Sequence, residues 1–166
     1  MTLDNATLSE IIVRPASFDD VDLLFHWRNL PEIIKLSSSR RSVSWPEHTS
    51  WLSSSLESDC IKIFIAQVNG VPIGQVRLEF GNSIAWLSIY LLPAFCGMGY
   101  GTYLIKLITS QAQDYFPKIS SVDAVIRNDN IRSISSFSRA GFFPIDLSSI
   151  HDSNTDFIHM RFEFLS

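Results

Sequence analysis

The chain contains little of what several protein classes depend on. Its 166 residues include two cysteines, seven glycines and seven prolines, and only 18% of them are charged. Cys60 and Cys96 form neither a disulfide framework nor the CxxC pair typical of zinc sites. The low glycine and proline content excludes a fibrous protein, and the net charge of −4 disfavours a general binder of nucleic acid or anionic membranes. We therefore expect no metal, nucleic-acid or membrane partner.

Long apolar runs and targeting signals are also missing from the sequence. No run approaches the roughly 18 apolar residues that a membrane span requires. Residues 1–10 contain neither the basic nor the apolar region of a signal peptide. A hydrophobic fraction of 46% suits a sizeable core in a chain of ordinary domain size. These features predict a cytoplasmic protein with a single domain over residues 9–166, preceded by an N-terminal extension at residues 1–8.

The spacing of the apolar residues changes along the chain and predicts a mixed fold. Helical spacing and capping signals predict helices from Ser17 or Asp19 to Pro31, from Ser44 onward, at 102–115 and at 130–140, with a polar loop at 36–42. Apolar and β-branched runs predict strands at 11–14, 62–68, 71–80, 83–92, 122–126 and 156–164. Two-residue turns at Asn69-Gly70 and Gly81-Asn82 make the three middle strands an antiparallel meander. The order of elements predicts an α/β (α+β) protein with a mixed, mostly antiparallel sheet.

A glycine-rich turn between a strand and a helix carries the first chemical signal. Residues 96–101 read Cys-Gly-Met-Gly-Tyr-Gly, and the helix is expected to follow them directly. Glycines let the backbone approach an anion closely, and the start of a helix supplies free N–H groups and a positive dipole end. A pyrophosphate group fits such a turn, although a merely tight turn is an equally good interpretation of so short a motif. The turn is neither a Walker A loop nor a dinucleotide-binding fingerprint.

A second motif lies downstream of the glycine-rich turn, at residues 127–133 and 137–142. Together the two stretches resemble the GNAT superfamily of acyl-CoA-dependent N-acetyltransferases. Gly99 and Gly101 match both glycines of the superfamily's turn motif, whereas Cys96 stands where that motif has Arg or Gln. Asn130, Phe137 and Gly141-Phe142 match the late motif. The resemblance covers nearly the whole chain and implies one GNAT-type domain with helices on both faces of its central sheet.

The resemblance implies acetyl-CoA as the acyl donor and no metal. In the family a splayed strand presents a backbone N–H to the acetyl carbonyl, and the matching position here is Leu91, with Ile89 nearby. The glycine-rich turn would hold the pyrophosphate, and Asn130 would bind the pantetheine arm. The cofactor-binding residues implied in this way are Ile89, Leu91, Cys96, Gly97, Met98, Gly99, Tyr100, Gly101, Thr102, Asn130 and Phe137.

Two positions depart from the family's pattern and affect the expected chemistry. Cys96 supplies no guanidinium near the phosphates, and Lys106, Arg132 and Arg139 are either compensating charges or solvated residues of a helix face. Phe137 stands where many members have the tyrosine that protonates coenzyme A, and a phenyl ring cannot donate a proton. Ser133, Ser136 or a water molecule would have to replace it, or the thiolate leaves unassisted.

The sequence also leaves open which residue is the general base. Ala85 occupies the strand position where some relatives carry a catalytic glutamate. Glu79, at the end of the preceding strand, and His48 are the candidate bases. A solvent-facing strand end is an equally good interpretation of Glu79.

The first third of the chain indicates which molecule accepts the acetyl group. Residues 25–32, with Glu47-His48 and Trp51 downstream, resemble a subgroup that acetylates the 4-amino group of UDP-linked amino sugars in pseudaminic-acid biosynthesis. This resemblance places Arg28 and His48 at the acceptor, and we expect Arg28, Arg40 and Arg41 to contact the UDP phosphates. The alternatives are a helix-end salt bridge for Arg28, a surface histidine for His48, and core packing for Trp27 and Trp51.

The sequence therefore predicts an acetyl-CoA-dependent N-acetyltransferase that acts on a nucleotide-linked amino sugar in a ternary complex, with a homodimer among the expected states. A protein N-terminal or small-amine acetyltransferase on the same scaffold is the first alternative. A non-catalytic acyl-CoA-binding module is the second, because Cys96 and Phe137 replace polar residues of the family.

Overall fold

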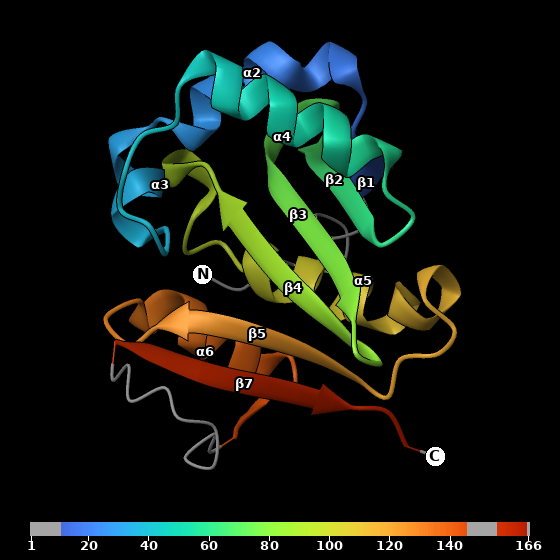
Figure 1. The fold of residues 1–166 in the computed structure, drawn as a ribbon. Coiled ribbons are helices and arrows are strands. Elements are labelled where there is room, and N and C mark those ends of the chain that lie inside the picture. Colours follow the sequence, from blue (N-terminus) through green and yellow to red (C-terminus); the bar gives the residue numbers. More distant parts are fainter. Residues whose placement is uncertain (1–10, 146–155, 166) are drawn as a thin grey trace.

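A seven-stranded sheet of order β1-β2-β3-β4-β5-β7-β6 runs through the computed structural model, which describes residues 11–145 and 156–165 (Figure 1). Neighbouring strands pair antiparallel except β4 and β5, which are parallel. The strands are β1 (Ile11–Pro15), β2 (Ile61–Val68), β3 (Val71–Gly81), β4 (Ile84–Leu91), β5 (Ser121–Arg127), β6 (Phe143–Pro144) and β7 (Phe157–Glu163). The helices are η1 (Phe18–Asp20), α2 (Val21–Arg28), α3 (Pro31–Leu36), α4 (Trp45–Glu57), η2 (Pro93–Phe95), α5 (Tyr100–Tyr115) and α6 (Ile131–Arg139).

Helices cover both faces of the sheet, and each face has its own apolar core (Figure 1). On one face, α5 and α6 pack against the inward-facing side chains of β2 to β5, with Leu104 and Ile108 at the centre. On the other face, α2 and α4 pack Leu24 and Leu52 against Ile63 and Ile65 of β2. The predicted α/β fold, with a mostly antiparallel sheet between two helical layers, is confirmed.

Local sequence signals explain most of the element boundaries. Ser44 and Glu47 form the expected capping box at the start of α4, since each side chain bonds to the other's backbone N–H. Asn69 and Gly70 both have positive φ, as a tight hairpin turn between β2 and β3 requires. The predicted extension at residues 1–8, and the start of the proposed domain at residue 9, lie outside the described residues.

Three details of the element prediction are wrong. Pro31 begins the short helix α3 instead of only ending the previous one, because the first turn of a helix does not need the N–H that proline lacks. The turn after β3 is Asn82-Ser83, one residue later than expected, since Gly81 still pairs with Ile84. The strand β6, which pairs with Arg161 and Met160 of β7, was not predicted. Its two residues are too few to show the alternating pattern of a strand.

The pairing of β4 with β5 ends early and creates the opening in which the site lies. Only Ile84–Trp86 pair with Ser121–Asp123. Beyond these residues the two strands diverge, which Figure 1 shows as a widening gap between the β4 and β5 arrows. The helix α5 connects them across the face that holds the larger core. The backbone of the second half of β4 therefore has a sheet neighbour only on its β3 side.

At the closed end of this opening, β5 and β7 are joined by a buried ionic cluster. The carboxylate of Asp123 accepts hydrogen bonds from the Ser121 hydroxyl at 2.9 Å, from His159 Nε2 at 2.7 Å and from two nitrogens of Arg161 at 2.7 and 2.9 Å. Burial raises the pKa of Asp123, but the hydrogen bonds from Arg161, His159 and Ser121 together lower it below its ordinary value. The carboxylate is therefore charged at neutral pH and holds the two strands together.

We expect Asp123→Asn to lower the free energy of unfolding by about 3 kcal/mol, because it leaves the Arg161 guanidinium without its counter-charge. The stabilisation is present above the ordinary aspartate pKa of 3.8 and is lost as the pH falls through the lower folded value, so the variant should also lose part of the acid dependence of stability. Urea unfolding at several pH values measures both effects. The exposed Asp114→Asn is the control, and equal midpoints for the two variants would contradict this role.

Gly74 is the second position on which the sheet depends. A Cβ atom there would lie 2.3 Å from the carbonyl oxygen of Tyr90 and 2.8 Å from Leu91 Cδ2, so β3 and β4 would have to move apart. We expect Gly74→Ala to cost about 2 kcal/mol in urea unfolding. Gly81→Ala on the same strand is the matched control, because its Cβ meets no atom within 4 Å. A midpoint for Gly74→Ala no lower than that of the control would show that the strands do not need this close approach.

Candidate active site

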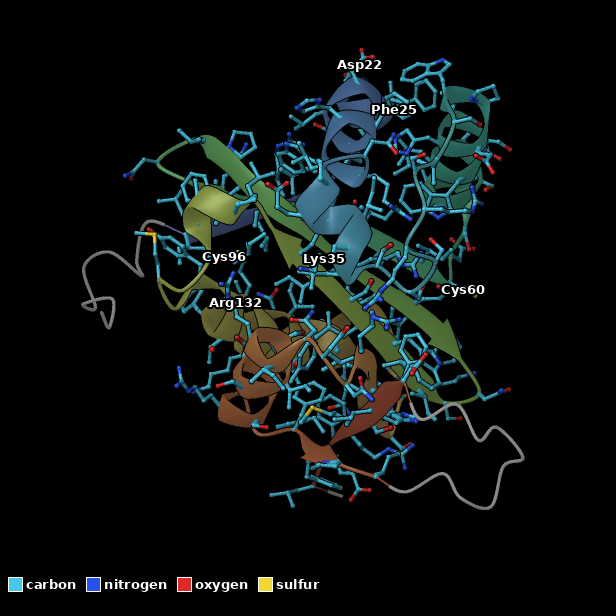
Figure 2. The ribbon with its side chains drawn as sticks, turned by 90° about the vertical axis from the view of Figure 1, so that its left-hand side faces the viewer. Asp22, Phe25, Lys35, Cys60, Cys96 and Arg132 are labelled. Carbon is cyan, nitrogen blue, oxygen red and sulfur yellow. The ribbon has the colours of Figure 1, made fainter. Side chains whose placement is uncertain are left out.

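A cavity of about 650 Å³ lies between the two halves of the molecule, where β4 and β5 diverge. Its walls come from α2, α3 and α4 on one side and from α5, β5 and α6 on the other, with β3 and β4 as the floor. A smaller cavity adjoins it and shares Leu36, Asn130 and Arg132 with it. Figure 2 looks toward this side of the molecule, where Lys35 of α3 and Arg132 of α6 line the smaller cavity.

Backbone N–H groups of β4 point into the large cavity. The N–H of Leu92 donates to the Ile73 carbonyl at 2.8 Å, and the strand register pairs Tyr90 with Gln75. In an antiparallel ladder alternate residues turn toward the partner strand. The N–H groups of Ile89 and Leu91 therefore point away from β3, toward the side where β4 has already separated from β5. Both residues line the cavity, and their N–H groups are placed to donate to a carbonyl oxygen.

The glycine-rich turn reaches the same cavity at the start of α5. Gly97 and Gly99 have φ of 77° and 88°, in the region that favours glycine. Gly99 is the N-cap of α5 and has no side chain to cap it, so the N–H groups of Tyr100, Gly101 and Thr102 lack intrahelical partners. These groups and the helix dipole suit an anion such as a phosphate. The turn thus provides what a pyrophosphate needs, and its geometry does not depend on a side chain at Cys96.

The turn residues differ in how they meet the cavity. Cys96 and Gly101 line it, and the Cys96 Sγ lies 3.6 Å from the Leu92 carbonyl oxygen. Gly97, Met98, Gly99 and Thr102 do not line it. The Tyr100 side chain is buried against Phe95, so that only its backbone is available to a ligand.

The start of α6 forms the opposite wall. Asn130 caps this helix, because its side-chain oxygen accepts from the Ser133 N–H at 3.2 Å, and both residues line the cavity. Ser136 lines it as well. Phe137 reaches it from the core, where its ring is 2% exposed and packs edge-on against Phe142 at 4.9 Å. The hydroxyl groups of this wall therefore come from serines.

His48 is buried instead of being a surface histidine. Its Nε2 lies 3.1 Å from the Val21 carbonyl oxygen, and its ring lies between those of Phe25 and Trp51 at 5.5 and 5.6 Å. Burial lowers the pKa of His48, and the nearby Arg28 lowers it further, although the hydrogen bond to Val21 opposes this. Because a carbonyl only accepts, Nε2 carries the proton and Nδ1 retains a lone pair in the neutral ring. His48 and Trp51 also line the cavity.

The charged side chains around the cavity are mostly arginines. Glu47 is the one acidic side chain among the described residues that line it. Its carboxylate is already engaged by the Ser44 N–H at 2.8 Å and by Arg41 at 3.1 Å, and these hydrogen bonds lower its pKa to about 2. The lining arginines are Arg28, Arg41, Arg77, Arg127 and Arg132. Arg77 and Arg127 are likewise ion-paired, with Glu79 and Asp129. The five arginines still outnumber these three carboxylates, so the cavity favours an anionic ligand over a polycation.

Besides these turn residues, two residues that the sequence assigned to catalysis or to the acceptor lie away from the cavity. Glu79 does not line it, since it pairs with Ile61 and Trp86 near the closed end and contacts Arg77 at 3.4 Å. Arg40 does not line it either, because it forms an ion pair with Asp129.

Arg28 meets the cavity in a way that the sequence did not suggest. It lines the cavity, but its guanidinium donates to the Arg41 carbonyl at 3.2 Å and to Ser39 Oγ at 3.1 Å. The alternative interpretation of Arg28, a helix-end salt bridge, is replaced by hydrogen bonds to a loop. Burial lowers the pKa of this guanidinium.

Polar residues on the floor of the cavity were missed by the sequence analysis. The Tyr90 hydroxyl donates to Gln75 Oε1 at 3.0 Å, and burial raises the pKa of this phenol. Arg77 and Ser88 are paired in the same register on the same two strands. The sequence signal that could have revealed them is the polar residues at alternate positions of two otherwise apolar strands. Such a pattern indicates a strand face that is not packed in a core.

Two other features, a metal centre and a membrane-spanning helix, are absent from the described residues. Within residues 11–145 and 156–165, no three His, Cys, Asp or Glu side chains are grouped so that they could hold a metal ion. In the same residues, no helix combines the length and the apolar character that crossing a membrane requires.

Comparisons with solved structures reveal relatives of the same fold. The aminoglycoside acetyltransferase AAC(6')-Ib with coenzyme A and kanamycin has a TM-score of 0.74 at 19% identity, over 92% of this chain and 94% of that one. Spermidine N-acetyltransferase from Vibrio cholerae with CoA and spermine has a TM-score of 0.78 at 16% identity, over 93% and 96%. A domain from Methanocaldococcus jannaschii has a TM-score of 0.78 at 22% identity, over 93% and 98%.

The comparison with curated proteins found no match. The model of the acetyltransferase (GNAT) family matches residues 30–142, which is more than half of the chain and includes the cavity floor, the glycine-rich turn and the start of α6. The chain therefore belongs to the acetyltransferase (GNAT) family of acetyl-CoA-dependent N-acetyltransferases.

Proposed function

We propose that the protein transfers an acetyl group from acetyl-CoA to the 4-amino group of a UDP-linked amino sugar. The observation that carries this proposal is the charge of the cavity, because its five lining arginines outnumber the three carboxylates paired with them, Glu47, Glu79 and Asp129. A diphosphate-linked acceptor matches such a cavity in charge. The resemblance of residues 25–32 and 47–51 to the amino-sugar subgroup favours the same acceptor.

The residues present fit acetyl-CoA. The N–H groups at the start of α5 suit the pyrophosphate, and Asn130 and the diverging β4 border the path that the pantetheine arm would take. When bound, acetyl-CoA supplies a thioester that a neutral amine attacks directly. The N–H groups of Leu91 and Ile89 would stabilise the negative charge that develops on the carbonyl oxygen.

His48 is the better candidate for the base. It lines the cavity, is neutral at pH 7 because burial lowers its pKa, and keeps a lone pair on Nδ1. Glu79 lies outside the cavity and is bound to Arg77. For the departing thiolate, the buried Phe137 supplies no proton, so the Ser133 hydroxyl on the cavity wall is the proposed hydrogen-bond donor, and solvent supplies the proton that the thiolate takes up.

The alternative acceptors differ from this one in charge. The two related acetyltransferases are bound to kanamycin and spermine, which are polycations. A small-amine acceptor of that kind would meet the arginines of this cavity, and close contacts between like charges are unfavourable. A thiol-release assay with acetyl-CoA and a panel of a UDP-4-amino sugar, spermine and an N-terminal peptide separates these acceptors. Acetyl-CoA binding in calorimetry without release on any amine would instead indicate a non-catalytic acyl-CoA-binding module.

We expect Arg41→Gln and Arg77→Gln each to raise the KM for the UDP-amino sugar about tenfold, since each loses a charged hydrogen bond to the acceptor. The KM for acetyl-CoA should stay unchanged. Steady-state thiol release measures both constants. Arg139→Gln on α6 is the matched control, because Arg139 is exposed and does not line the cavity. The anionic acceptor would be rejected if both variants kept the wild-type KM.

We expect His48→Gln to lower kcat at least a hundredfold, which is the usual contribution of a general base. Glutamine keeps an N–H for the Val21 carbonyl but has no basic nitrogen. The wild-type rate should fall as the pH drops below a midpoint that lies under 6.5, since burial lowers the His48 pKa, and this limb should vanish in the variant. Calorimetry with acetyl-CoA checks that the variant still folds and binds. A variant that binds and retains the acidic limb would exclude His48 as the base.

A further inference from the structure

A loop between α3 and α4 borders the cavity from the acceptor side. We call residues 37–43 the strap. Ser37, Ser38, Arg41 and Val43 of the strap line the cavity, so its position sets part of the cavity's shape and charge. Arg40 lies in the middle of the strap and has a φ of 48°, an unfavourable conformation for a residue other than glycine. Contacts of the strap with the rest of the fold must offset this cost.

One side of the strap is attached to the end of α2. Arg28 donates to the Arg41 carbonyl at 3.2 Å and to Ser39 Oγ at 3.1 Å. Asn29 and Val43 exchange two hydrogen bonds, in which Asn29 Nδ2 donates at 3.1 Å and the Val43 N–H donates at 2.8 Å. These contacts lie within the N-terminal half of the chain and attach residues 39, 41 and 43 of the strap to the end of α2.

The other attachment crosses to the opposite half of the molecule. Arg40 forms an ion pair with Asp129, which follows β5 and directly precedes Asn130, the cap of α6. Asp129 also accepts from Arg127 Nε at 3.3 Å. Slight burial raises the pKa of Asp129, but Arg40 and Arg127 outweigh it and lower the pKa, so the carboxylate is charged at neutral pH.

The ion pair lies at the rim of the site. Neither partner lines the large cavity, whereas Asp129 lines the smaller one that adjoins it at Leu36, Asn130 and Arg132. The pair thus connects the two walls of the site just outside the space where the reaction would occur. A bond in that place restrains the strap without occupying the acceptor's volume.

We propose that Asp129 is a positioning residue which, through Arg40, latches the strap over the bound acceptor, and that this latch opens to admit acceptor and release product. The inference rests on the proposed function, because it assigns the strap to the acceptor. The side chains of Arg40 and Asp129 are 45% and 54% exposed. Exposed ion pairs are weak, so that breaking this one should favour the open strap only about two- to fivefold. A weak latch suits a contact that must break in every turnover.

Hydrogen exchange of the strap amides tests the latch without any substrate. We expect exchange at residues 37–43 to be about two- to fivefold faster in Asp129→Asn and in Arg40→Asn than in the wild type. Asparagine is chosen at position 40 because it tolerates positive φ. Exchange of the strap amides in the double variant should be no faster than in either single variant. In Asp129→Glu, which keeps the charge, exchange should be as slow as in the wild type. Asp114→Asn, an exposed aspartate of α5, is the control.

Kinetics then separate a latch from a general structural role. Asp129→Asn should raise the KM for the acceptor two- to fivefold and leave the KM for acetyl-CoA and the thermal midpoint unchanged. Unchanged strap exchange in both single variants would overturn the proposal. So would faster exchange in α6 instead of the strap, because Asp129 would then act on its own helix. If no amine is acetylated, the proposed function fails, and the exchange of the strap still decides whether the latch exists.

Discussion

The loss of hydrogen bonding between β4 and β5 after three residue pairs is the constraint on which the site depends. A parallel pair that continued to the ends of both strands would consume the N–H groups of Ile89 and Leu91 and close the cavity. The divergence leaves these donors without a strand partner on that side, yet fixed in direction by β3. Fixed donors in a partly enclosed space stabilise developing charge at little cost of reorganisation. The close approach of β3 at Gly74 and the ionic cluster at Asp123 fix the two strands on either side of the opening.

Around this opening the two halves of the chain contribute different chemistry. The second half supplies backbone groups at the start of α5 and hydroxyl groups on α6, which suit a phosphorylated acyl carrier. The first half supplies three of the five lining arginines, a neutral histidine and the strap, which we propose as determinants of the acceptor. The solved acetyltransferases bound to kanamycin and spermine share the fold at 19% and 16% identity, and a glycine-rich turn that acts through its backbone is a geometry that many sequences can form.

Much of the fold could be predicted from the sequence because its signals are local. The Asn69-Gly70 turn, the Ser44-Glu47 capping box and the glycines before α5 each act within a few residues. The glycine-rich turn, at which the cofactor-binding residues were predicted, carries the same kind of signal. What could not be predicted arises between distant residues. Nothing near Arg40 in sequence indicates that it pairs with Asp129, 89 positions later. Glu79 was placed at the site by its position near a strand end, whereas the register sets it beside Trp86 at the closed end.

The parallel pairing of β4 and β5 also has a consequence for folding. Strands β2 to β4 pair through two short hairpins, whereas β1 joins β2, and β5 joins β4, only after the helices between them in sequence have formed. Contacts of such sequence separation form slowly, because chain closure must precede them. The catalytic cavity is therefore among the last features to form on the folding pathway. A ligand that contacts both walls of the cavity binds only after the early and the late parts of the fold have come together. The binding energy of this ligand is therefore added to the stability of the entire chain.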